Sequence, residues 1–420
     1  MDETHVVTCL LRNRGEVLLL KRSDAVGSYA GRWGAVTGHA ESDPDGAARE
    51  EIAEETGLKD GVSLVRTGEP FAVTDDDRDT RWIVHPSLFD CGSRAVESND
   101  ETTDVEWIAP PEIRRRETVP DLWTAYERVA PTVETVGRDT DHGSAWLSVR
   151  ALEVLRDRAG VLATAADEGG KEDGWDDLAA LAKGLRAARP GMAVVGNRID
   201  RTMAAASDDR TSGAVERAAR AGIERAFEAD DGAAREGAAW LGGTVLTLSR
   251  SGTVTAALRR AAVEELLVCE SRPAREGVGV AEELADETTT TLAIDAAAAH
   301  LLAERTVDAV VVGADTVFPD GSVLNKVGTR AVAVAATHEN VPVYAVAASD
   351  KIDPDPEPEP EFANGDRDRV YDGDADLAVT NPTFDRTPAE HVAVVTENGR
   401  LGRDDIAETA AELRETATRW

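Results

Sequence analysis

Residues 308–312, DAVVV, form a short apolar run that is followed directly by a glycine. Similar runs recur on both sides of it, separated by stretches with the composition of helices: TVLTL (244–248), ELLVC (265–269), TLAID (291–295) and VPVYAVA (341–347). Wholly apolar strands that alternate with helices are typical of a parallel sheet covered on both faces, the doubly wound arrangement. Ligands bind such sheets at the carboxyl ends of the strands, so the residues just after these runs are the first candidates for a functional site.

The sequence before this region has a different pattern. Residues 4–11 and 16–22 (EVLLLKR) indicate strands around a turn, and residues 45–57 indicate a helix with Asp45 as N-cap and Gly57 at its end. Residues 143–240 are predominantly helical in pattern.

The predicted fold class is therefore α/β and α+β, in two domains. The N-terminal domain is a mixed sheet with helices, and the C-terminal one is a helical subdomain followed by a doubly wound parallel sheet. We predict an N-terminal domain at residues 1–130 and a linker at 131–142. A helical subdomain at 143–240 and a sheet subdomain at 241–420 then follow.

The charge balance is strongly acidic. Among 420 residues, 80 acidic side chains face 46 basic ones, which gives a formal net charge of -34. Such a charge repels nucleic acid and anionic membranes, and it suits an acidic surface adapted to high salt. The three cysteines lack metal-site spacing, and the sequence shows neither a signal-peptide pattern nor a long apolar run. Together with the charge, these features predict a cytoplasmic, halophilic protein without nucleic-acid or membrane partners.

Residue types in the C-terminal half favour recognition of a phosphorylated sugar. Such a ligand needs cations and backbone amides for its phosphates, hydrogen-bonding groups for its hydroxyls, and acid/base groups for proton transfer. Only six lysines occur in the chain, so two that follow predicted strands are informative. The candidate substrate-binding residues are Gly143, Ser144, Arg189, Asn325, Lys326 and Lys351.

Several segments of this half resemble the family that joins ribose-1,5-bisphosphate isomerase, methylthioribose-1-phosphate isomerase and the alpha, beta and delta subunits of initiation factor 2B. The segments are ARPGMAV (188–194), VLTLSRSGTV (245–254), CESRPAREG (269–277), VVVGADTVFPDGSVLNKVGT (310–329), AASDKIDP (347–354) and NPTFDRTPAEHV (381–392). The resemblance implies that Asp315 is the catalytic acid and that the domain self-associates into a homo-oligomer. It also implies substrate contacts for Arg189, Asn325, Lys326 and Lys351.

One position departs from the isomerases in this family. Their catalytic cysteine is replaced by Ser249, and a neighbouring histidine by Leu248. A hydroxyl is a far weaker acid than a thiol, whose pKa is normally near 8.5. Cys269 also ends a predicted strand, where a buried core thiol is the expectation. Ser249 is therefore a degenerate catalytic position.

The N-terminal half carries the sequence AAREEIAEETGL (47–58). On a helix, Glu51, Glu54 and Glu55 share one face, and three such like charges need a cation. Mg²⁺ or Mn²⁺ suits carboxylate oxygens and bridges to a diphosphate. The alternative is a solvated acidic face, which an acidic chain produces readily.

The order of segments around these glutamates resembles Nudix hydrolases. EVLLLKR, RWGAVTGHAES (32–42), the glutamate helix and EWIAPPEI (106–113) follow one another as in that family. The resemblance implies metal binding by Glu51, Glu54 and Glu55, with Glu54 and Glu55 also catalytic, and hydrolysis of a nucleoside diphosphate derivative. Pro44 and Glu50 depart from the family's pattern, which has a glutamate and an arginine there.

Three functions remain open from sequence. The first is a Nudix hydrolase fused to a domain that binds a ribose phosphate or nucleotide, with a phosphorylated small molecule as partner. The second is a ribose-1,5-bisphosphate-type isomerase. The third is a non-catalytic regulatory protein like initiation factor 2B, which the serine at position 249 favours.

Overall fold

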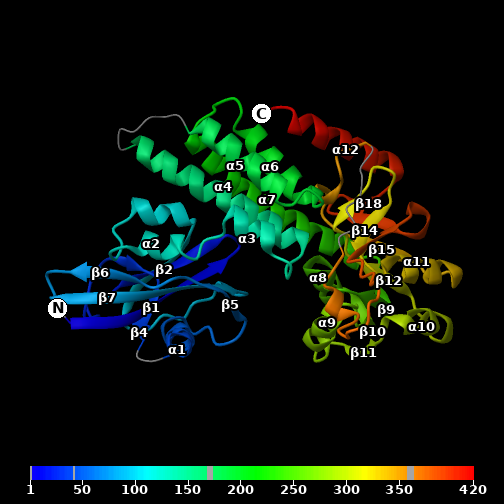
Figure 1. Ribbon diagram of the computed structural model, residues 1–420, viewed down its shortest axis with the longest axis horizontal. Coiled ribbons are helices and arrows are strands. Elements are labelled where there is room, and N and C mark those ends of the chain that lie inside the picture. The colour runs from blue at the N-terminus through cyan, green and yellow to red at the C-terminus, as the bar shows by residue number, and fades with distance from the viewer. Residues whose placement is uncertain (1, 41–42, 168–173, 357–363) are drawn as a thin grey trace. The chain divides into compact units, whose positions relative to one another are not determined.

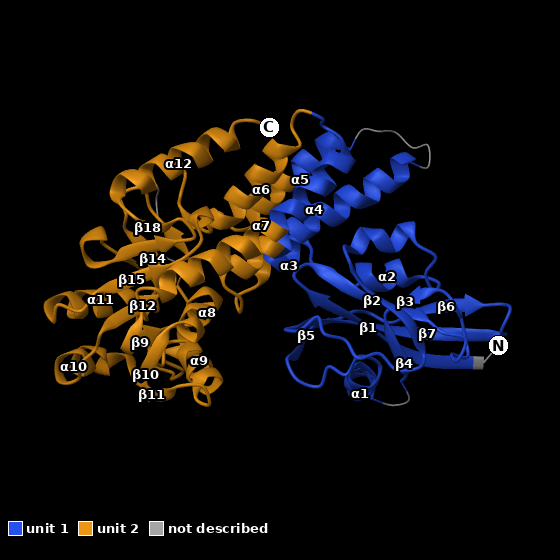
Figure 2. Cartoon of the chain, turned by 180° about the vertical axis from the view of Figure 1, so that it is seen from behind, with its two compact units in different colours: residues 1–136, 150–181, 209–223 blue, residues 137–149, 182–208, 224–420 orange. Residues whose placement is uncertain are grey.

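The computed structural model describes residues 2–40, 43–167, 174–356 and 364–420. The chain forms two compact units, shown in blue and orange in Figure 2. Unit 1 comprises residues 1–136, 150–181 and 209–223, and unit 2 comprises residues 137–149, 182–208 and 224–420. Within the described ranges, no helix has the length and apolarity needed to cross a bilayer.

Unit 1 is built on an eight-stranded mixed sheet, in which β1 and β7 run parallel in the centre. Strand β4 pairs with β1, β6 and β5 pair with β7, and β2 joins β3 and β8. The strands are β1 (Asp2–Asn13), β2 (Glu16–Arg22), β3 (Trp33–Gly34), β4 (Val36–His39), β5 (Val62–Thr67), β6 (Phe71–Asp75), β7 (Thr80–Cys91) and β8 (Thr102–Ile108).

Helices cover both faces of this sheet, α1 on one and α2 on the other (Figure 1). They are α1 (Pro44–Thr56), η1 (Pro110–Arg115), α2 (Leu122–Glu127) and α3 (Val133–Arg138). The predicted first helix is confirmed, but its N-cap is Asp43 and not Asp45, because Pro44 occupies the first helical position. Gly57 closes α1 with a φ of 72°, as predicted.

The hairpin between β1 and β2 turns on two residues with positive φ, Arg14 at 49° and Gly15 at 82°. Positive φ at both positions matches the twist of a two-residue hairpin. A Cβ on Gly15 would lie 2.9 Å from a methyl carbon of Ile223, so only glycine allows α7 this close to the turn. The Gly15 carbonyl accepts a hydrogen bond from Arg156 of α4 at 2.5 Å.

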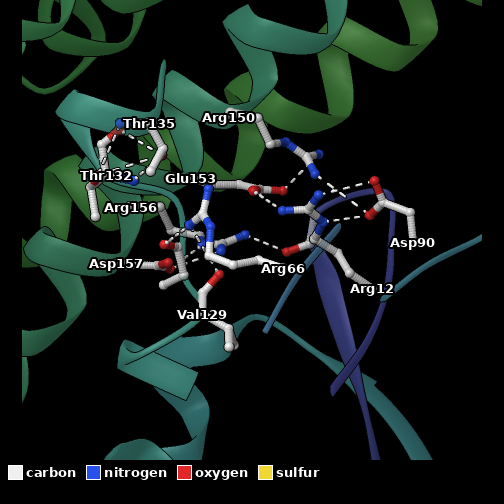
Figure 3. Close-up of polar contacts among 12 residues, drawn as sticks. Arg12, Arg66, Asp90, Val129, Thr132, Thr135, Arg150, Glu153, Arg156 and Asp157 are labelled. Carbon is white, nitrogen blue, oxygen red and sulfur yellow. Dashed lines mark hydrogen bonds and ion pairs between the residues drawn. The ribbon is translucent and has the colours of Figure 1, made fainter. Parts of the chain in front are cut away.

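A buried group of charges joins the sheet of unit 1 to α4 (Figure 3). Arg12 contacts both oxygens of Asp90, at 2.6 and 3.0 Å, and its other nitrogen donates to Glu153 at 3.1 Å. Arg150 contacts Glu153 at 2.9 Å. The Arg12 and Glu153 side chains are 3% and 0% exposed, so these charges rely on one another in place of water.

Unit 2 is built on a seven-stranded sheet in the order β11-β10-β9-β12-β15-β17-β18, parallel throughout except for the last pair. Its strands are β9 (Gly242–Leu248), β10 (Ala262–Cys269), β11 (Thr289–Ala293), β12 (Ala309–Val312), β15 (Val343–Val346), β17 (Ala393–Thr396) and β18 (Gly399–Leu401). A small antiparallel sheet holds β13 (Thr316–Val317), β14 (Val323–Lys326) and β16 (Phe384–Thr387). The doubly wound prediction is confirmed.

Both faces of the seven-stranded sheet are buried under helices. Residues of α7, α8 and α9 pack on one face, and residues of α10, α11 and α12 on the other. These helices are α7 (Ser212–Ala238), α8 (Gly252–Arg260), α9 (Glu276–Leu284), α10 (Ala298–Glu304), α11 (Thr329–His338) and α12 (Arg403–Ala417). Each wholly apolar strand therefore meets a helix on either side, which explains its lack of alternation.

The predicted helical region consists of α4 (Ser144–Asp167), α5 (Trp175–Ala188), α6 (Ala193–Ala205) and α7. Helices α4, α5 and α7 each contribute residues to both compact units. Short 3-10 turns complete the chain: η2 (Asp295–Ala297), η3 (Ser349–Lys351), η4 (Arg367–Arg369) and η5 (Ala389–His391).

Candidate functional site

The first candidate site lies where α1 packs against β4. Glu51 lies directly over Gly38, where a Cβ would come within 1.8 Å of the carboxylate oxygen of Glu51. Glu55 is 7% exposed, and its carboxylate accepts a hydrogen bond from the Thr37 amide at 3.1 Å. Glu54 is exposed on the same helix. The glycine and the glutamates of the predicted motif are thus brought into one packed arrangement.

Charge is concentrated around Glu55. Burial raises the pKa of Glu55 to about 8. The hydrogen bond from Thr37 opposes this rise in pKa, whereas the nearby charge of Glu51 adds to it. Arg22 lowers the pKa of the same carboxyl and Glu101 raises it. Sequence analysis missed Arg22 and Glu101, because both lie outside the glutamate helix and their proximity depends on the tertiary fold.

The donor set of α1 suits a hard divalent cation, since carboxylate oxygens are what Mg²⁺ and Mn²⁺ prefer. Burial, and next the charge of Glu54, raise the pKa of Glu51, as expected where like charges lie close together. Within the described residues, however, no three His, Cys, Asp or Glu side chains are arranged to hold a metal ion. Metal binding by these glutamates therefore stays a prediction.

The second candidate site lies at the carboxyl edge of the seven-stranded sheet, in unit 2. Asp315 follows β12, and its carboxylate accepts a hydrogen bond from the Ser144 hydroxyl at 2.8 Å. Lys351 follows β15 and donates to the Ala314 carbonyl at 2.5 Å. Burial lowers the pKa of Lys351, and the nearby charge of Asp315 opposes that change. Three predicted residues from distant parts of the chain are thus brought together.

Helix α6 holds the turn that carries Lys351. The Asn197 amide donates to the carbonyls of Asp350 and Ile352, at 2.7 and 2.8 Å. Arg198 donates to the Asp350 carboxylate at 3.0 Å, and both side chains are buried. Sequence analysis missed this support, because polar residues on a helix usually face solvent. The signal available was the pair Asn197-Arg198 within an otherwise amphipathic helix.

Two further predicted residues lie on β14. Asn325 is 6% exposed and donates to the Thr329 hydroxyl at 2.9 Å. Its amide oxygen would lie 3.8 Å from a Cβ on Gly313, which follows β12. Lys326 forms an ion pair with Glu276 of α9 at 2.5 Å. Asn325 therefore lies beside the loop that leads to Asp315, while Lys326 is engaged with α9.

Ser249 has a strained backbone. Its φ is 65°, and Ser271, after the neighbouring strand β10, has the same φ. The Ser249 amide donates to the Ser271 hydroxyl at 2.5 Å. Non-glycine residues in the left-handed region are uncommon and concentrate at functional sites. The position is therefore held in an unusual conformation by its neighbour.

Arg189 and Gly143 occupy loops at this end of unit 2. The Arg189 guanidinium donates to the Asp139 carbonyl. Gly143 precedes the first turn of α4 and is exposed, and a side chain at this position would meet open space among the described residues. His142 forms an ion pair with Asp139 at 2.8 Å and stacks on Trp146. The loop between α3 and α4 thus links Arg189 to the segment that carries Ser144.

Unit 2 contains a cavity of about 310 Å³. It is lined mainly by apolar atoms and includes Leu248, Cys269 and Gly328, which adjoin the ends of β9, β10 and β14. Cys269 is 1% exposed, and burial raises its pKa to about 12. The expectation of a buried core thiol is confirmed, and such a thiol is poorly suited to act as a base at neutral pH.

Two family models match the chain, and together they cover most of it. The NUDIX domain model matches residues 2–132, and the Initiation factor 2 subunit family model matches residues 140–402.

Curated relatives match mainly the second region. Ribose 1,5-bisphosphate isomerase of Haloferax volcanii is 33% identical over 313 residues, which cover 68% of this chain and 94% of the relative. A second relative comes from Nocardia farcinica and is described as a probable bifunctional methylthioribose-1-phosphate isomerase/methylthioribulose-1-phosphate dehydratase. It is 40% identical over 187 residues, which cover 41% of this chain and 34% of the relative. Methylthioribose-1-phosphate isomerase of Pseudomonas syringae is 37% identical over 175 residues, which cover 38% of this chain and 47% of the relative. The chain thus spans half or less of the length of several relatives.

Solved structures show the same fold at low sequence identity. Translation initiation factor eIF-2B of Pyrococcus horikoshii OT3 has a TM-score of 0.54 and 23% identity, covering 65% of this chain and 97% of that one. The 5-methylthioribose 1-phosphate isomerase of the same organism has a TM-score of 0.51 and 20% identity. The match covers 74% of this chain and 89% of that one. A chain of the tetrameric eIF2B-beta2-delta2 complex from C. thermophilum has a TM-score of 0.50 and 22% identity. The match covers 67% of this chain and 92% of that one.

Proposed function

Because the chain belongs to the Initiation factor 2 subunit family and carries an N-terminal NUDIX domain, we propose that it combines a hydrolase with a sugar-phosphate-binding domain. The N-terminal half hydrolyses a nucleoside diphosphate derivative, and the second half binds a ribose phosphate or nucleotide. Both halves then act on phosphorylated ribose compounds, which gives the fusion a chemical rationale.

The hydrolase proposal rests on the packed glutamates of α1. Glu51, Glu54 and Glu55 would hold Mg²⁺ or Mn²⁺, which would supply Lewis-acid stabilisation of the diphosphate charge. The hydrogen bond from the Thr37 amide orients the Glu55 carboxylate. Its pKa of about 8 means that, without a cation, the Glu55 carboxyl is mostly protonated at neutral pH.

The test of this half uses ADP-ribose and sugar-modified nucleotides with Mg²⁺, and measures release of the nucleoside monophosphate. We expect Glu54→Gln to lower the rate by about tenfold or more, because a proposed cation ligand is lost. Glu50→Gln is the matched control, since it removes the same charge from the adjacent position and leaves the proposed ligands intact. Equal effects of the two substitutions would argue against the proposed roles.

The binding proposal rests on the group formed by Ser144, Asp315 and Lys351. Asp315 is held by the Ser144 hydroxyl and Lys351 lies beside the same loop, so an acid and a cation are available at one edge of the sheet. Asn325 adds an amide for a sugar hydroxyl, and Lys326 and Arg189 add cations for phosphate. Titration with ribose 1,5-bisphosphate should give saturable heat that Lys351→Met abolishes. Lys183→Met, at an exposed lysine of α5, should leave binding unchanged.

Two observations favour different second functions for this half. The extensive match to the Haloferax volcanii relative favours isomerisation of ribose 1,5-bisphosphate. Ser249 favours a regulatory role, because its hydroxyl does not readily replace a thiol in proton transfer. Sugar-phosphate binding without turnover would support the regulatory function, and turnover by the unmodified protein would support the isomerase.

Self-association through the second domain is part of the proposal. Similar chains include one from a tetrameric complex, and light scattering coupled to size exclusion would measure the mass of this protein. A mass of 44.7 kDa, that of one chain, would argue against the homo-oligomer.

A further inference from the structure

Two histidines meet on the face of the unit 1 sheet that carries α1. Val7 of β1 lies opposite His85 of β7 on one side and opposite Gly38 of β4 on the other. Because side chains alternate along a strand, His5, two residues before Val7, points to the same face. Glu51 lies over Gly38, so His85 sits two strands, or about 10 Å, from the backbone beneath that glutamate.

Helix α1 covers only part of this face. Further along, the Cys9 thiol contacts the Ala48 carbonyl of α1, and both Cys9 and Phe89 are buried. At the other end of the same face the His5 side chain is 44% exposed and His85 is partly exposed. An open, polar part of the sheet therefore lies beside the proposed cation-binding glutamates.

The histidines belong to an ordered chain of polar contacts. Arg81 contacts the Glu3 carboxylate at 2.6 Å, and the same carboxylate lies 3.6 Å from His5 Nε2. His5 Nδ1 lies 3.0 Å from His85 Nε2, and the two rings stack. One of these two ring nitrogens donates to the other, and when His85 Nε2 is the donor, His85 Nδ1 carries a lone pair.

The charge state agrees with this arrangement. Burial, followed by the neighbouring His5, lowers the pKa of His85 and favours its neutral form. A neutral imidazole nitrogen with a lone pair accepts a hydrogen bond from a hydroxyl but offers nothing to a fully ionised phosphate.

We propose that His85 Nδ1 accepts a hydrogen bond from a sugar hydroxyl of the group that a nucleoside diphosphate carries beyond its diphosphate. This inference rests on the proposed hydrolase function of the same domain. The diphosphate lies at the glutamates of α1, and the attached pentose extends along β1 and β7 to the histidine pair. His5 is a positioning residue, because its Nδ1 contacts Nε2 of His85 and holds that ring in place.

The test compares KM and kcat for ADP-ribose with Mg²⁺. His85→Phe keeps a ring of similar size but removes the acceptor, and should raise KM about fivefold with kcat little changed, as expected for one neutral hydrogen bond. His85→Asn keeps an acceptor and should recover part of the loss. His338→Phe, at an exposed histidine of α11, is the matched control and should leave both constants unchanged.

Direct binding separates this inference from the proposed function. If the unmodified protein binds ADP-ribose without hydrolysing it, the hydrolase proposal fails, while weaker binding by His85→Phe still supports the hydroxyl contact. If the unmodified protein hydrolyses ADP-ribose and His85→Phe has the same KM, the inference alone is overturned. No binding of ADP-ribose by the unmodified protein overturns it as well.

Discussion

The buried charge cluster of unit 1 leads to a sharp prediction for Glu153→Gln. The substitution preserves the shape of a side chain that is 0% exposed but removes its charge. Arg12 and Arg150 then share Asp90, which is 31% exposed and lies 2.6 Å from the former and 3.7 Å from the latter. Removing one partner of a buried ion pair typically costs about 3–5 kcal/mol. For a unit of fewer than 200 residues this corresponds to a fall in Tm of roughly 10 °C.

Thermal and denaturant unfolding of the full chain would measure this cost. The control is Glu287→Gln, which breaks an exposed pair with Arg259 and should cost far less stability. Raising the salt concentration should diminish the control effect and leave the Glu153 effect largely intact, because buried pairs are screened less. A loss below about 1 kcal/mol for Glu153→Gln would refute the reasoning. The double change Arg12→Met with Glu153→Leu should recover much of the stability.

Three further predictions follow from the same structure. Lys351→Met should raise stability at pH 7, because burial lowers the pKa of Lys351 and the folded state disfavours its charge. That gain should shrink as pH rises from the lowered pKa towards the unfolded value near 10.4, and a gain that is independent of pH would contradict it. Ser249→Cys should create or greatly raise turnover of ribose 1,5-bisphosphate; unmodified protein that is already as fast would show that the hydroxyl suffices. A fragment of residues 1–136 should lack a cooperative unfolding transition, since Arg12 loses Glu153; a sharp transition near that of the full chain would disprove this dependence.

The sheet of unit 2 was predictable because its signal is local. Five apolar runs coincide with β9, β10, β11, β12 and β15, and each is recognisable without knowledge of its neighbours. The placement of Asp315 and Lys351 at one edge follows from topology, since parallel strands present their carboxyl ends together. Sequence analysis did not identify β17 and β18, which are only four and three residues long.

The contacts that depend on distance along the chain were not predictable. Arg12 and Glu153 are 141 residues apart, and in a chain of net charge -34 each resembles an ordinary surface charge. The same holds for His5 and His85, which meet only because β1 and β7 pair in one register. A shift of one residue would place them on opposite faces of the sheet. The contact between the two histidines is therefore set by how the strands pair, which the residue types alone do not reveal.

The two kinds of cation have different structural roles in this protein. Arg12 and Arg198 are buried among several carboxylates, and each planar guanidinium group donates hydrogen bonds to more than one of them. Lys326 and Lys351 instead stand at the carboxyl edge as point charges, against a glutamate and a carbonyl. A phosphate that reaches Lys326 must compete with Glu276, whose second oxygen is buried and has no hydrogen-bond partner among the described residues. Glu276→Gln should therefore tighten ribose-phosphate binding, and unchanged affinity in that variant would place the phosphate away from Lys326.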